Sequence, residues 1–439
     1  MMKLAVIFES SPFDRKGLFN AVHNRVKHLL ATGECSIDVF CVHSRDNAFT
    51  RRVRHTPDVP FVDEVVVDDI RYRLLWYRFS ILDNVLLEKL HVRPWLFRRF
   101  MESHMDLLKG YDAVIAHSFC GGLFALAAHE RFGIPYYVTW HGSDVHTHPW
   151  RVPVILEDTR AVMESARCNF FVSRALMEAS EKIISNIRKE VLYNGVSEDF
   201  VKYPPEDRAA VRERYGLAPE DKVVAFVGNL SAVKNVLSLP EIFAQVAKGY
   251  DGPLKFWIIG DGKLKAQLET SCSERLLCHC EERSPSRHCE ERSDVAIRFF
   301  GNQPSPAMPD IMNCIDVLVL PSLNEGLPLV CAEALSCGAA VVGSDVGGIA
   351  EVIGSDNVVP LVSPSDNVSP SDNGSPSDNV PPPGSHSEGL SRLYDDSFVN
   401  GMAEKVVAAL VGQAPSQTLP PDISWSRTAA QELAALKSL

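Results

Sequence analysis

The chain has 439 residues, of which 46% are hydrophobic and 23% are charged, and its formal net charge at pH 7 is −12. This length favours two domains, and the acidic balance argues against a general nucleic-acid-binding protein. The sequence has no run of about 20 apolar residues, so no membrane span is expected. The eleven cysteines are irregularly placed, which is typical of reduced thiols in a cytoplasmic protein.

The first half of the chain alternates short apolar runs with helical patterns, as in a doubly wound parallel sheet. The opening run, residues 4–8, is too short for a signal peptide and indicates a first buried strand. The other strands predicted in this half are residues 37–42, 64–67, 113–116, 136–139, 168–172 and 190–192.

One segment of this half combines basic and aromatic residues. The first 110 residues hold 17 Lys/Arg against 14 Asp/Glu, and residues 92–101 interleave arginines with aromatic side chains. Such a pattern is typical of a helix that lies on a membrane surface and would suit an anionic or lipid-linked acceptor. The alternative, which we favour, is a helix that packs Trp95, Leu96 and Phe100 inward and keeps its arginines in water.

The strand–helix pattern restarts in the second half, with strands predicted at residues 223–227, 255–259, 297–300, 317–320 and 340–342. Proline-rich acidic segments at residues 203–207 and 217–221 interrupt the periodicity before this restart. We therefore predict a first domain at residues 1–205 and a second at residues 206–415. A capped helix is expected at residues 423–439.

Two short repeats interrupt the second domain. The sequence HCEERS occurs at residues 279–284 and again at 288–293, and SPSDN occurs three times from residue 363. We interpret the surrounding segments, about 272–294 and 363–389, as exposed low-complexity inserts. The Cys and His residues of the first repeat also suggest zinc ligands, but their spacing is not C-x2-C and they arise by duplication, so no metal site is predicted.

The segment 321–338, PSLNEGLPLVCAEALSCG, carries two glutamates eight residues apart, Glu325 and Glu333. An apolar strand is predicted directly before it. A helical pattern follows and ends at Gly338, a residue type that commonly closes helices. Glu325 is therefore expected in a turn after a strand, and Glu333 about two helical turns further on.

The same turn has the features of a phosphate site. Gly326 permits a tight turn, and Pro328 suits a first helical turn, where its missing N–H costs nothing. A helix N-terminus after a strand favours an anion, because its free amides and dipole both attract negative charge. Carboxylates on either side could hold sugar hydroxyls, which is what a nucleotide-sugar site requires.

With its flanking residues, this segment resembles the retaining, nucleotide-sugar-dependent glycosyltransferases of GT-B architecture (group 1, family 4 type), which carry an E-x7-E motif. The resemblance covers about residues 3–200 and 220–439, apart from the inserts. It implies an α/β fold of two Rossmann-like doubly wound domains facing a cleft. It also implies that the helix at 423–439 packs back on the first domain.

The resemblance assigns donor-binding roles in the E-x7-E segment. It implies that Glu325 faces the donor sugar and acts in catalysis, and that Glu333 holds the ribose. It also places the donor diphosphate at the helix N-terminus, beside Gly326, Leu327 and Leu329.

A second matching motif, GNLSAVKN, begins at Gly228. The family pattern here is G-R-L-x-x-x-K-G, in which Arg and Lys hold the diphosphate. Lys234 matches, whereas Asn229 replaces the Arg and Asn235 the final Gly. The resemblance implies that Lys234 stabilises the charge of the leaving group and is catalytic, with Asn229 donating hydrogen bonds.

Two further positions of the second domain match the family. Gly260 belongs to a G-x-G turn after the strand at 255–259, which implies contact with the donor. Gln303 lies in the loop that the family uses beside the nucleotide base.

The first domain supplies four more candidate residues. His141 and Asp144 form an H-G-x-D turn after the strand at 136–139, which in the family places the His against the donor sugar, and we assign Asp144 to the acceptor side. Gly17 lies where the family has a pair of glycines near the diphosphate. His117, at the end of another predicted strand, is a second acceptor-side candidate, with a structural role as the alternative.

The expected activity is therefore transfer of a sugar from a nucleotide-diphospho-sugar, such as a UDP-sugar, to a glycan or lipid-linked acceptor with retention of configuration, in cell-surface polysaccharide or glycolipid synthesis. The sequence shows no D-x-D carboxylate pair, so neither a metal nor another cofactor is expected, and no nucleic-acid partner is expected. The alternatives are a nucleotide-sugar epimerase or hydrolase on the same fold, and a degenerate, non-catalytic nucleotide-sugar-binding subunit. The expected location is the cytoplasm. The alternative is peripheral contact with the inner face of the membrane through residues 92–101.

Overall fold

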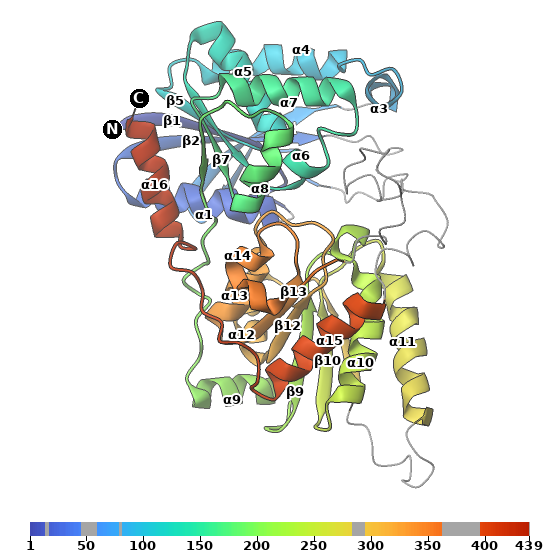
Figure 1. The fold of residues 1–439 in the computed structure, drawn as a ribbon. Coiled ribbons are helices and arrows are strands. Elements are labelled where there is room, and N and C mark those ends of the chain that lie inside the picture. The colour runs from blue at the N-terminus through green and yellow to red at the C-terminus, as the bar shows by residue number, and fades with distance from the viewer. Residues whose placement is uncertain (14–16, 45–58, 79–80, 283–294, 362–395, 439) are drawn as a thin grey trace. The chain divides into compact units, whose positions relative to one another are not determined.

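The computed structural model describes residues 1–13, 17–44, 59–78, 81–282, 295–361 and 396–438. These form two compact units, Met1–Gly195 with Asp422–Leu439, and Val196–Pro421. Each unit is built around its own sheet of largely parallel strands with helices on both faces (Figure 1). The prediction of an α/β protein with two Rossmann-like domains is confirmed.

The sheet of the first unit has eight strands in the order β3-β4-β2-β1-β5-β6-β7-β8. Neighbouring strands are parallel, except for the antiparallel pair β3–β4 at one edge. The central strands are continuous apolar runs because helices cover both of their faces. The strands are β1 (Met2–Glu9), β2 (Cys35–Ser44), β3 (Glu64–Val67), β4 (Ile70–Tyr77), β5 (Ala113–His117), β6 (Tyr136–Trp140), β7 (Cys168–Phe171) and β8 (Lys189–Val191).

Strand β4 was not predicted from the sequence. Its arginines Arg71 and Arg73 alternate with buried side chains and lie 3.7 Å from the carboxylate of Glu64 on β3. The two strands are joined by Asp68 and Asp69, both with positive φ, as a tight hairpin turn requires. The alternating arginines hid a strand that lies second from the edge of the sheet, between β3 and β2.

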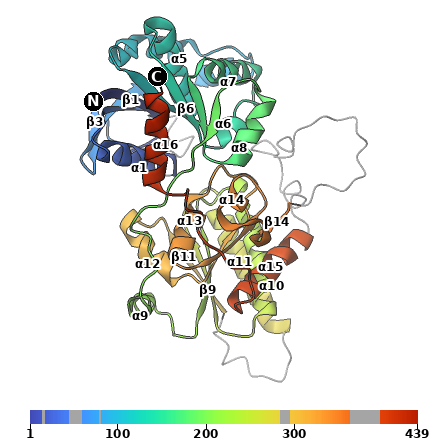
Figure 2. The ribbon, with the colours of Figure 1, turned by 60° about the vertical axis from the view of Figure 1, so that its left-hand side comes forward.

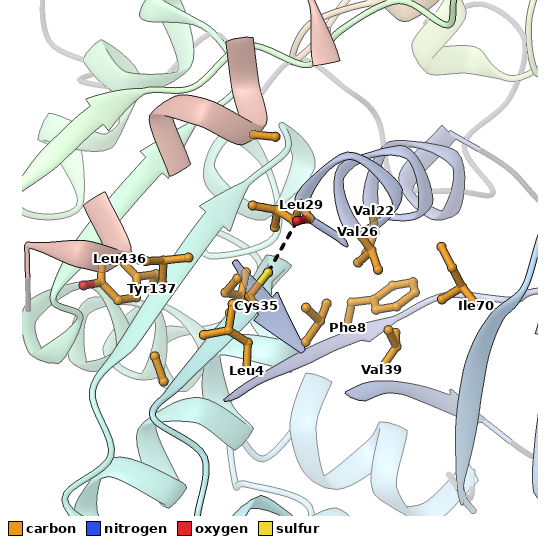
Figure 3. Close-up of a cluster of buried hydrophobic side chains, with 14 of the residues drawn as sticks. Leu4, Phe8, Val22, Val26, Leu29, Cys35, Val39, Ile70, Tyr137 and Leu436 are labelled. Atoms are coloured by element: carbon orange, nitrogen blue, oxygen red, sulfur yellow. Dashed lines mark hydrogen bonds between the residues drawn. The ribbon is translucent and has the colours of Figure 1, made fainter. Parts of the chain in front are cut away.

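The helices of the first unit lie on both faces of its sheet. Figure 3 shows side chains of α1, α16 and the central strands, including Val26, Leu436 and Phe8, gathered in one buried cluster. The Tyr137 hydroxyl donates to the carbonyl of Ala435 at 3.2 Å, so the C-terminal helix α16 packs on this unit. The helices are α1 (Gly17–Ala31), α3 (Ile81–Glu88), α4 (Trp95–His104), α5 (Ser118–Phe132), α6 (Ser143–His146), α7 (Pro153–Ser165), α8 (Arg174–Ala179) and α16 (Trp425–Lys437).

The sheet of the second unit has six parallel strands in the order β11-β10-β9-β12-β13-β14. The direction of strand addition reverses between β9 and β12, and open α/β sheets bind ligands at the carboxyl ends of strands beside such a reversal. The strands are β9 (Lys222–Val227), β10 (Leu254–Ile259), β11 (Val295–Gly301), β12 (Val317–Leu320), β13 (Ala340–Ser344) and the short, unpredicted β14 (Val358–Val359).

Helices also cover both faces of the second sheet. Helices α10, α11 and α15 lie together on one face, and α12, α13 and α14 lie on the other (Figures 1 and 2). The helices are α9 (Pro205–Arg214), α10 (Leu239–Gly249), α11 (Lys265–Glu282), α12 (Met308–Cys314), α13 (Leu329–Ser336), α14 (Ile349–Ile353) and α15 (Asp396–Leu410).

Helix α4 corrects the favoured interpretation of residues 92–101. Trp95 and Leu96 are 60% and 41% exposed, so these side chains do not pack inward. Phe97 and Phe100 do, with ring centroids 6.3 and 5.8 Å from that of Phe124 on α5. The helix therefore turns one apolar face to the unit and leaves two large apolar side chains in solvent. No helix in the described ranges is long and apolar enough to cross a membrane.

Most of the two predicted inserts, residues 283–294 and 362–395, lies outside the described residues. Helix α11 continues to Glu282, so residues 272–282 of the first insert are helical. The possible zinc ligands His288 and Cys289 are also outside the described part. Within the described part, no group of three or more His, Cys, Asp or Glu side chains could hold a metal ion.

Candidate functional site

The second unit brings two predicted catalytic residues into direct contact. Lys234 ends the 3-10 helix η3 (Ala232–Lys234) after β9, and Glu325 lies in the turn after β12. The Lys234 ammonium donates to Oε1 of Glu325 at 2.5 Å, and the Ser322 hydroxyl donates to the same oxygen at 2.7 Å. A cation and a carboxylate thus meet at the carboxyl ends of the two strands where the sheet order reverses.

The turn that carries Glu325 is held by its neighbours through the backbone. The Leu323 amide donates to the carbonyl of Val233 at 2.8 Å, which ties this turn to the Lys234 loop. On the other side, the Gly348 amide donates to the carbonyl of Gly326 at 2.9 Å. These two bonds hold the turn on both sides of Glu325.

A glycine allows the close approach on that second side. Gly347 has φ of +52°, and a Cβ placed on it would lie 1.9 Å from the carbonyl oxygen of Glu325. The Ser344 hydroxyl also donates to the carbonyl of Ser322. Neither serine nor Gly347 was predicted from the sequence to be a site residue. The glycine pair after the predicted strand at 340–342 was the only available signal.

Helix α13 provides the expected helix N-terminus beside Glu325. Pro328 is its N-cap and Leu329 its first residue, so the first-turn amides face the turn. Gly338 follows the helix with φ of +87°, as predicted for a closing residue. Leu327 is buried, so it contributes packing and backbone to this turn.

Glu333 lies on α13 and its side chain is half-buried. Burial alone raises the pKa of its carboxyl group to about 7, because an ionised carboxylate loses its hydration there. Hydrogen-bond donors such as a pair of vicinal hydroxyls would stabilise the ionised form. The residue therefore has the chemistry that the ribose role requires.

The two glycine loops of the second unit pack backbone against backbone. A Cβ on Gly260 would lie 2.0 Å from the carbonyl oxygen of Gly228, and one on Gly262 would lie 2.3 Å from that of Leu230. The Leu230 amide donates to the carbonyl of Asp261 at 2.9 Å. Side chains would separate these loops, so the G-x-G turn serves to bring the Lys234 loop close to β10.

The two departures from the family pattern have different structural settings. Asn235 adopts φ of +50° and ψ of +37°, a left-handed conformation that glycine prefers and asparagine tolerates. Asn235 therefore preserves the turn after Lys234. The Asn229 side chain, in place of the family's Arg, is exposed at the head of the same loop.

Gln303 occupies a loop tied to the G-x-G turn, because the Gly260 amide donates to the carbonyl of Gly301 at 2.9 Å. The Gln303 side chain is half-buried and donates to the carbonyl of Phe300 at 2.8 Å. Its amide oxygen remains available as an acceptor towards a ligand.

In the first unit, two predicted histidines form a pair. His117 ends β5 and His141 follows β6, and their Nδ1 and Nε2 atoms are 3.1 Å apart. The backbone amides of His141 and Gly142 donate to the Asp144 carboxylate at 3.1 and 2.8 Å. Asp144 is 5% exposed. Its two hydrogen bonds to the backbone hold the His141 turn in place.

The histidine pair is uncharged at neutral pH. Burial lowers the pKa of both rings well below the ordinary value, and the nearby guanidinium of Arg25 lowers them further. One neutral imidazole therefore donates its N–H to the other. The pair offers hydrogen bonding, and it does not offer a positive charge.

Arg25 itself was missed by sequence analysis. It is buried on α1, donates to the Thr139 hydroxyl at 2.7 Å and to Asn194 at 3.4 Å, and lies 3.7 Å from the carboxylate of Glu432 on α16. It therefore links α1 and the C-terminal helix to the strand that leads into His141. From sequence, an arginine in a helix is expected to face solvent, and only the tertiary structure shows that Arg25 is buried.

Gly17, the remaining candidate, is the first residue of α1. A Cβ placed on it would meet no atom within 4 Å. The described structure therefore sets no steric requirement for glycine at this position, and its link to the diphosphate stays a prediction.

The fold and these strand-end turns define a class, the GT-B proteins. The structure matches the Anabaena protein HepE in complex with UDP and glucose with a TM-score of 0.61, 16% identity and full coverage of both chains. It matches sucrose-phosphate synthase from Thermosynechococcus elongatus with a TM-score of 0.62 and 16% identity, covering 100% of this chain and 99% of that one.

The family follows from the sequence. Residues 17–195 match the model of the glycosyl transferase 4-like domain, and residues 221–370 match that of glycosyl transferases group 1. The two matches span most of both units. The chain therefore carries a glycosyl transferase 4-like domain followed by a glycosyl transferases group 1 domain.

Several curated relatives share part of the chain. It is 28% identical over 244 residues to the Bacillus subtilis protein TuaC, named for teichuronic acid biosynthesis, covering 55% of each chain. It is 27% identical over 251 residues to N-acetyl-alpha-D-glucosaminyl L-malate synthase of Bacillus anthracis, covering 57% of this chain and 59% of that one. The chain thus spans little more than half the length of these two relatives. The D-inositol 3-phosphate glycosyltransferase of Actinosynnema mirum matches over 344 residues at 25% identity, covering 74% and 72%.

Proposed function

We propose that this protein transfers a sugar from a nucleotide-diphospho-sugar to a glycan or lipid-linked acceptor, with retention of anomeric configuration. The observation that carries the proposal is the convergence of Lys234 and Glu325 at the strand ends where the second sheet reverses order. An anionic diphosphate and a polyhydroxylated sugar are the ligands that such a cation and carboxylate would take together.

The second unit would hold the donor. Lys234 and the first amides of α13, at Leu329, would stabilise the diphosphate, with Asn229 donating further hydrogen bonds. Glu333 would accept hydrogen bonds from the ribose hydroxyls and Glu325 from those of the sugar. The half-buried Gln303 would contact the base.

The reaction breaks the bond between the anomeric carbon and the diphosphate oxygen and forms one to the acceptor oxygen. Lys234 stabilises the charge that develops on the departing diphosphate. The acceptor's proton passes to an oxygen of that diphosphate on the same face of the sugar. Glu325 would support the positive charge at the anomeric carbon.

His141 of the first unit would hydrogen-bond a sugar hydroxyl as a neutral imidazole. Its low pKa, caused mainly by burial, keeps it uncharged throughout the neutral range. Its role is therefore positioning, with Asp144 fixing its turn and His117 donating to or accepting from its ring.

A UDP-sugar is the donor we propose, and a cell-surface polysaccharide or glycolipid is the product. Structures of the fold relative HepE with UDP and with UDP-glucose support the donor, and the name of TuaC supports the product. On α4, exposed Trp95 and Leu96 beside Arg98 and Arg99 support peripheral contact with an anionic membrane surface. Co-sedimentation with anionic vesicles, lost in Trp95→Glu, would test that contact.

The main test is a thermal-shift screen with UDP, GDP, ADP and their common sugar conjugates. Stabilisation by one nucleotide family is expected and should be lost in Glu333→Ala, whereas Glu404→Ala, on an exposed face of α15, should behave as wild type. Proton NMR of the product then reports the anomeric configuration. A donor consumed only by water would favour the hydrolase alternative, and no shift with any nucleotide would overturn the proposal.

A further inference from the structure

Lys234 and Glu325 occupy unequal positions within their ion pair. The Glu325 side chain is 8% exposed and that of Lys234 is 26% exposed. The carboxylate also accepts the Ser322 hydroxyl. The backbones of Leu323 and Gly326, on either side of Glu325 in the turn, are hydrogen-bonded to Val233 and Gly348. Lys234 is the partner that can turn towards a ligand, because its long side chain is the more mobile and exposed.

We infer that this ion pair makes the donor site select the intact nucleotide sugar over the same nucleotide without its sugar. The inference rests on the proposed function and deepens it. A diphosphate that draws Lys234 towards itself competes with Glu325 for the ammonium, and a buried carboxylate that loses this partner needs other hydrogen-bond donors. Glu325 is thus a specificity-determining residue as well as a sugar contact.

The two ligands differ in what they offer to Glu325. The hydroxyls of a donor sugar are hydrogen-bond donors and can replace the ammonium of Lys234 at the carboxylate. A nucleoside diphosphate offers no donor at that position, and its terminal phosphate brings additional negative charge towards Glu325. Ser322 supplies one hydrogen bond to the carboxylate with either ligand. The difference in affinity between the two ligands therefore depends on the sugar hydroxyls.

This arrangement would favour release of the spent nucleotide after transfer. Once the sugar has left, the Glu325 carboxylate regains its attraction for Lys234 and competes with the diphosphate for it. The same residues that hold the donor therefore weaken the binding of the nucleotide product, which reduces product inhibition.

The test compares the dissociation constants of UDP and UDP-glucose by calorimetry, or of the equivalent pair if the thermal screen selects another base. Glu325→Gln keeps the shape of the side chain and removes its charge. UDP should bind about tenfold more tightly to this variant, as expected when a buried charge conflict is removed, while UDP-glucose should bind no more tightly. Glu333→Gln, at the ribose position, should weaken both ligands and leave their ratio unchanged.

A double-mutant cycle links the effect to Lys234. In the Lys234→Met background, Glu325→Gln should tighten UDP binding clearly less than it does in the wild-type background, because no ammonium is freed and only the repulsion between the terminal phosphate and Glu325 is relieved. If the wild-type protein binds UDP and Glu325→Gln binds it no more tightly, the inference is overturned and the proposed function stays intact. A wild-type protein that binds neither ligand nor any equivalent pair would overturn both.

Discussion

The two units place their candidate residues at the same kind of location, the carboxyl ends of parallel strands, but they treat charge in opposite ways. In the first unit the histidine pair is neutral, and the charged pair Arg25–Glu432 lies beneath it. In the second unit the charged pair Lys234–Glu325 is itself at the strand ends. A shared backbone geometry therefore does not fix the electrostatics of a site.

Exposure shows what each pair can do. The side chains of Arg25 and Glu432 are 1% and 0% exposed, so no ligand can exchange with either partner. Lys234 is 26% exposed, so a ligand can compete for it. The first pair is suited to fixing structure and the second to binding, and this contrast can be tested at three levels.

The largest expected effect is on the stability of the first unit. Glu432→Leu leaves the Arg25 guanidinium buried without its counter-charge, which should lower the free energy of unfolding by about 3–5 kcal/mol. The double variant Arg25→Met, Glu432→Leu should recover most of that loss, because it removes both charges. Urea denaturation of the full chain measures both.

The matched control lies in the second unit. Glu325→Gln breaks an ion pair whose lysine is partly in solvent, so its cost should be much smaller, about 1 kcal/mol or less. Equal losses in Glu432→Leu and in the double variant would show that Arg25 and Glu432 do not act as a pair, and the contrast between the units would fail.

The next effect concerns the turn under Glu325. Gly347→Ala combines a positive φ with a Cβ that would lie 1.9 Å from the Glu325 carbonyl oxygen, so we expect a loss of about 2–4 kcal/mol. Gly412→Ala has φ of +72° and no atom within 4 Å, so it should cost about 1–2 kcal/mol. Chemical denaturation of the two variants separates backbone strain from crowding, and equal losses would contradict the packing of Gly347 on Glu325.

Much of the fold follows from the sequence because its strands are buried and apolar. The prediction failed at β4, the second strand from the sheet edge, where Arg71 and Arg73 alternate with buried residues, and at the two-residue edge strand β14. The sequence pattern of α4 could not show which aromatic residues pack, because it does not tell which face of the helix meets α5. Phe97 lies on that face and Trp95 does not. Whether a strand forms near a sheet edge, and which face of a half-exposed helix is buried, depends on neighbouring elements that a local sequence pattern does not describe.

The candidate site divides in a similar way. The motifs named Lys234, Glu325, His117 and His141, and the structure brings each pair together. The motifs did not reveal the residues that support those pairs. Such residues, for example Arg25 and Glu432, are far apart in the chain and meet only in the folded protein. Such supporting residues are ordinary by type and acquire their role only through packing.

The smallest expected effect, and the sharpest comparison of the two sites, is the pH dependence of donor binding. Burial raises the pKa of Glu333 to about 7 and lowers those of His117 and His141 well below their usual value. Of these three groups, only the Glu333 carboxyl should therefore change its charge between pH 6 and 8. In the proposed donor site the ionised carboxylate accepts the ribose hydrogen bonds, so donor binding should weaken as the pH falls through about 7 and level off above it.

Calorimetry with UDP-glucose measures this directly, because both of its phosphates are diesters with no proton that titrates near neutrality. The dissociation constant should rise by at most about tenfold per pH unit, the limit for a single proton. Glu333→Gln should bind with little pH dependence, since an amide does not titrate, whereas His141→Gln should keep the wild-type profile. A profile that persists in Glu333→Gln and disappears in His141→Gln would place the titrating group in the first unit and reverse the assignment of charge between the two sites.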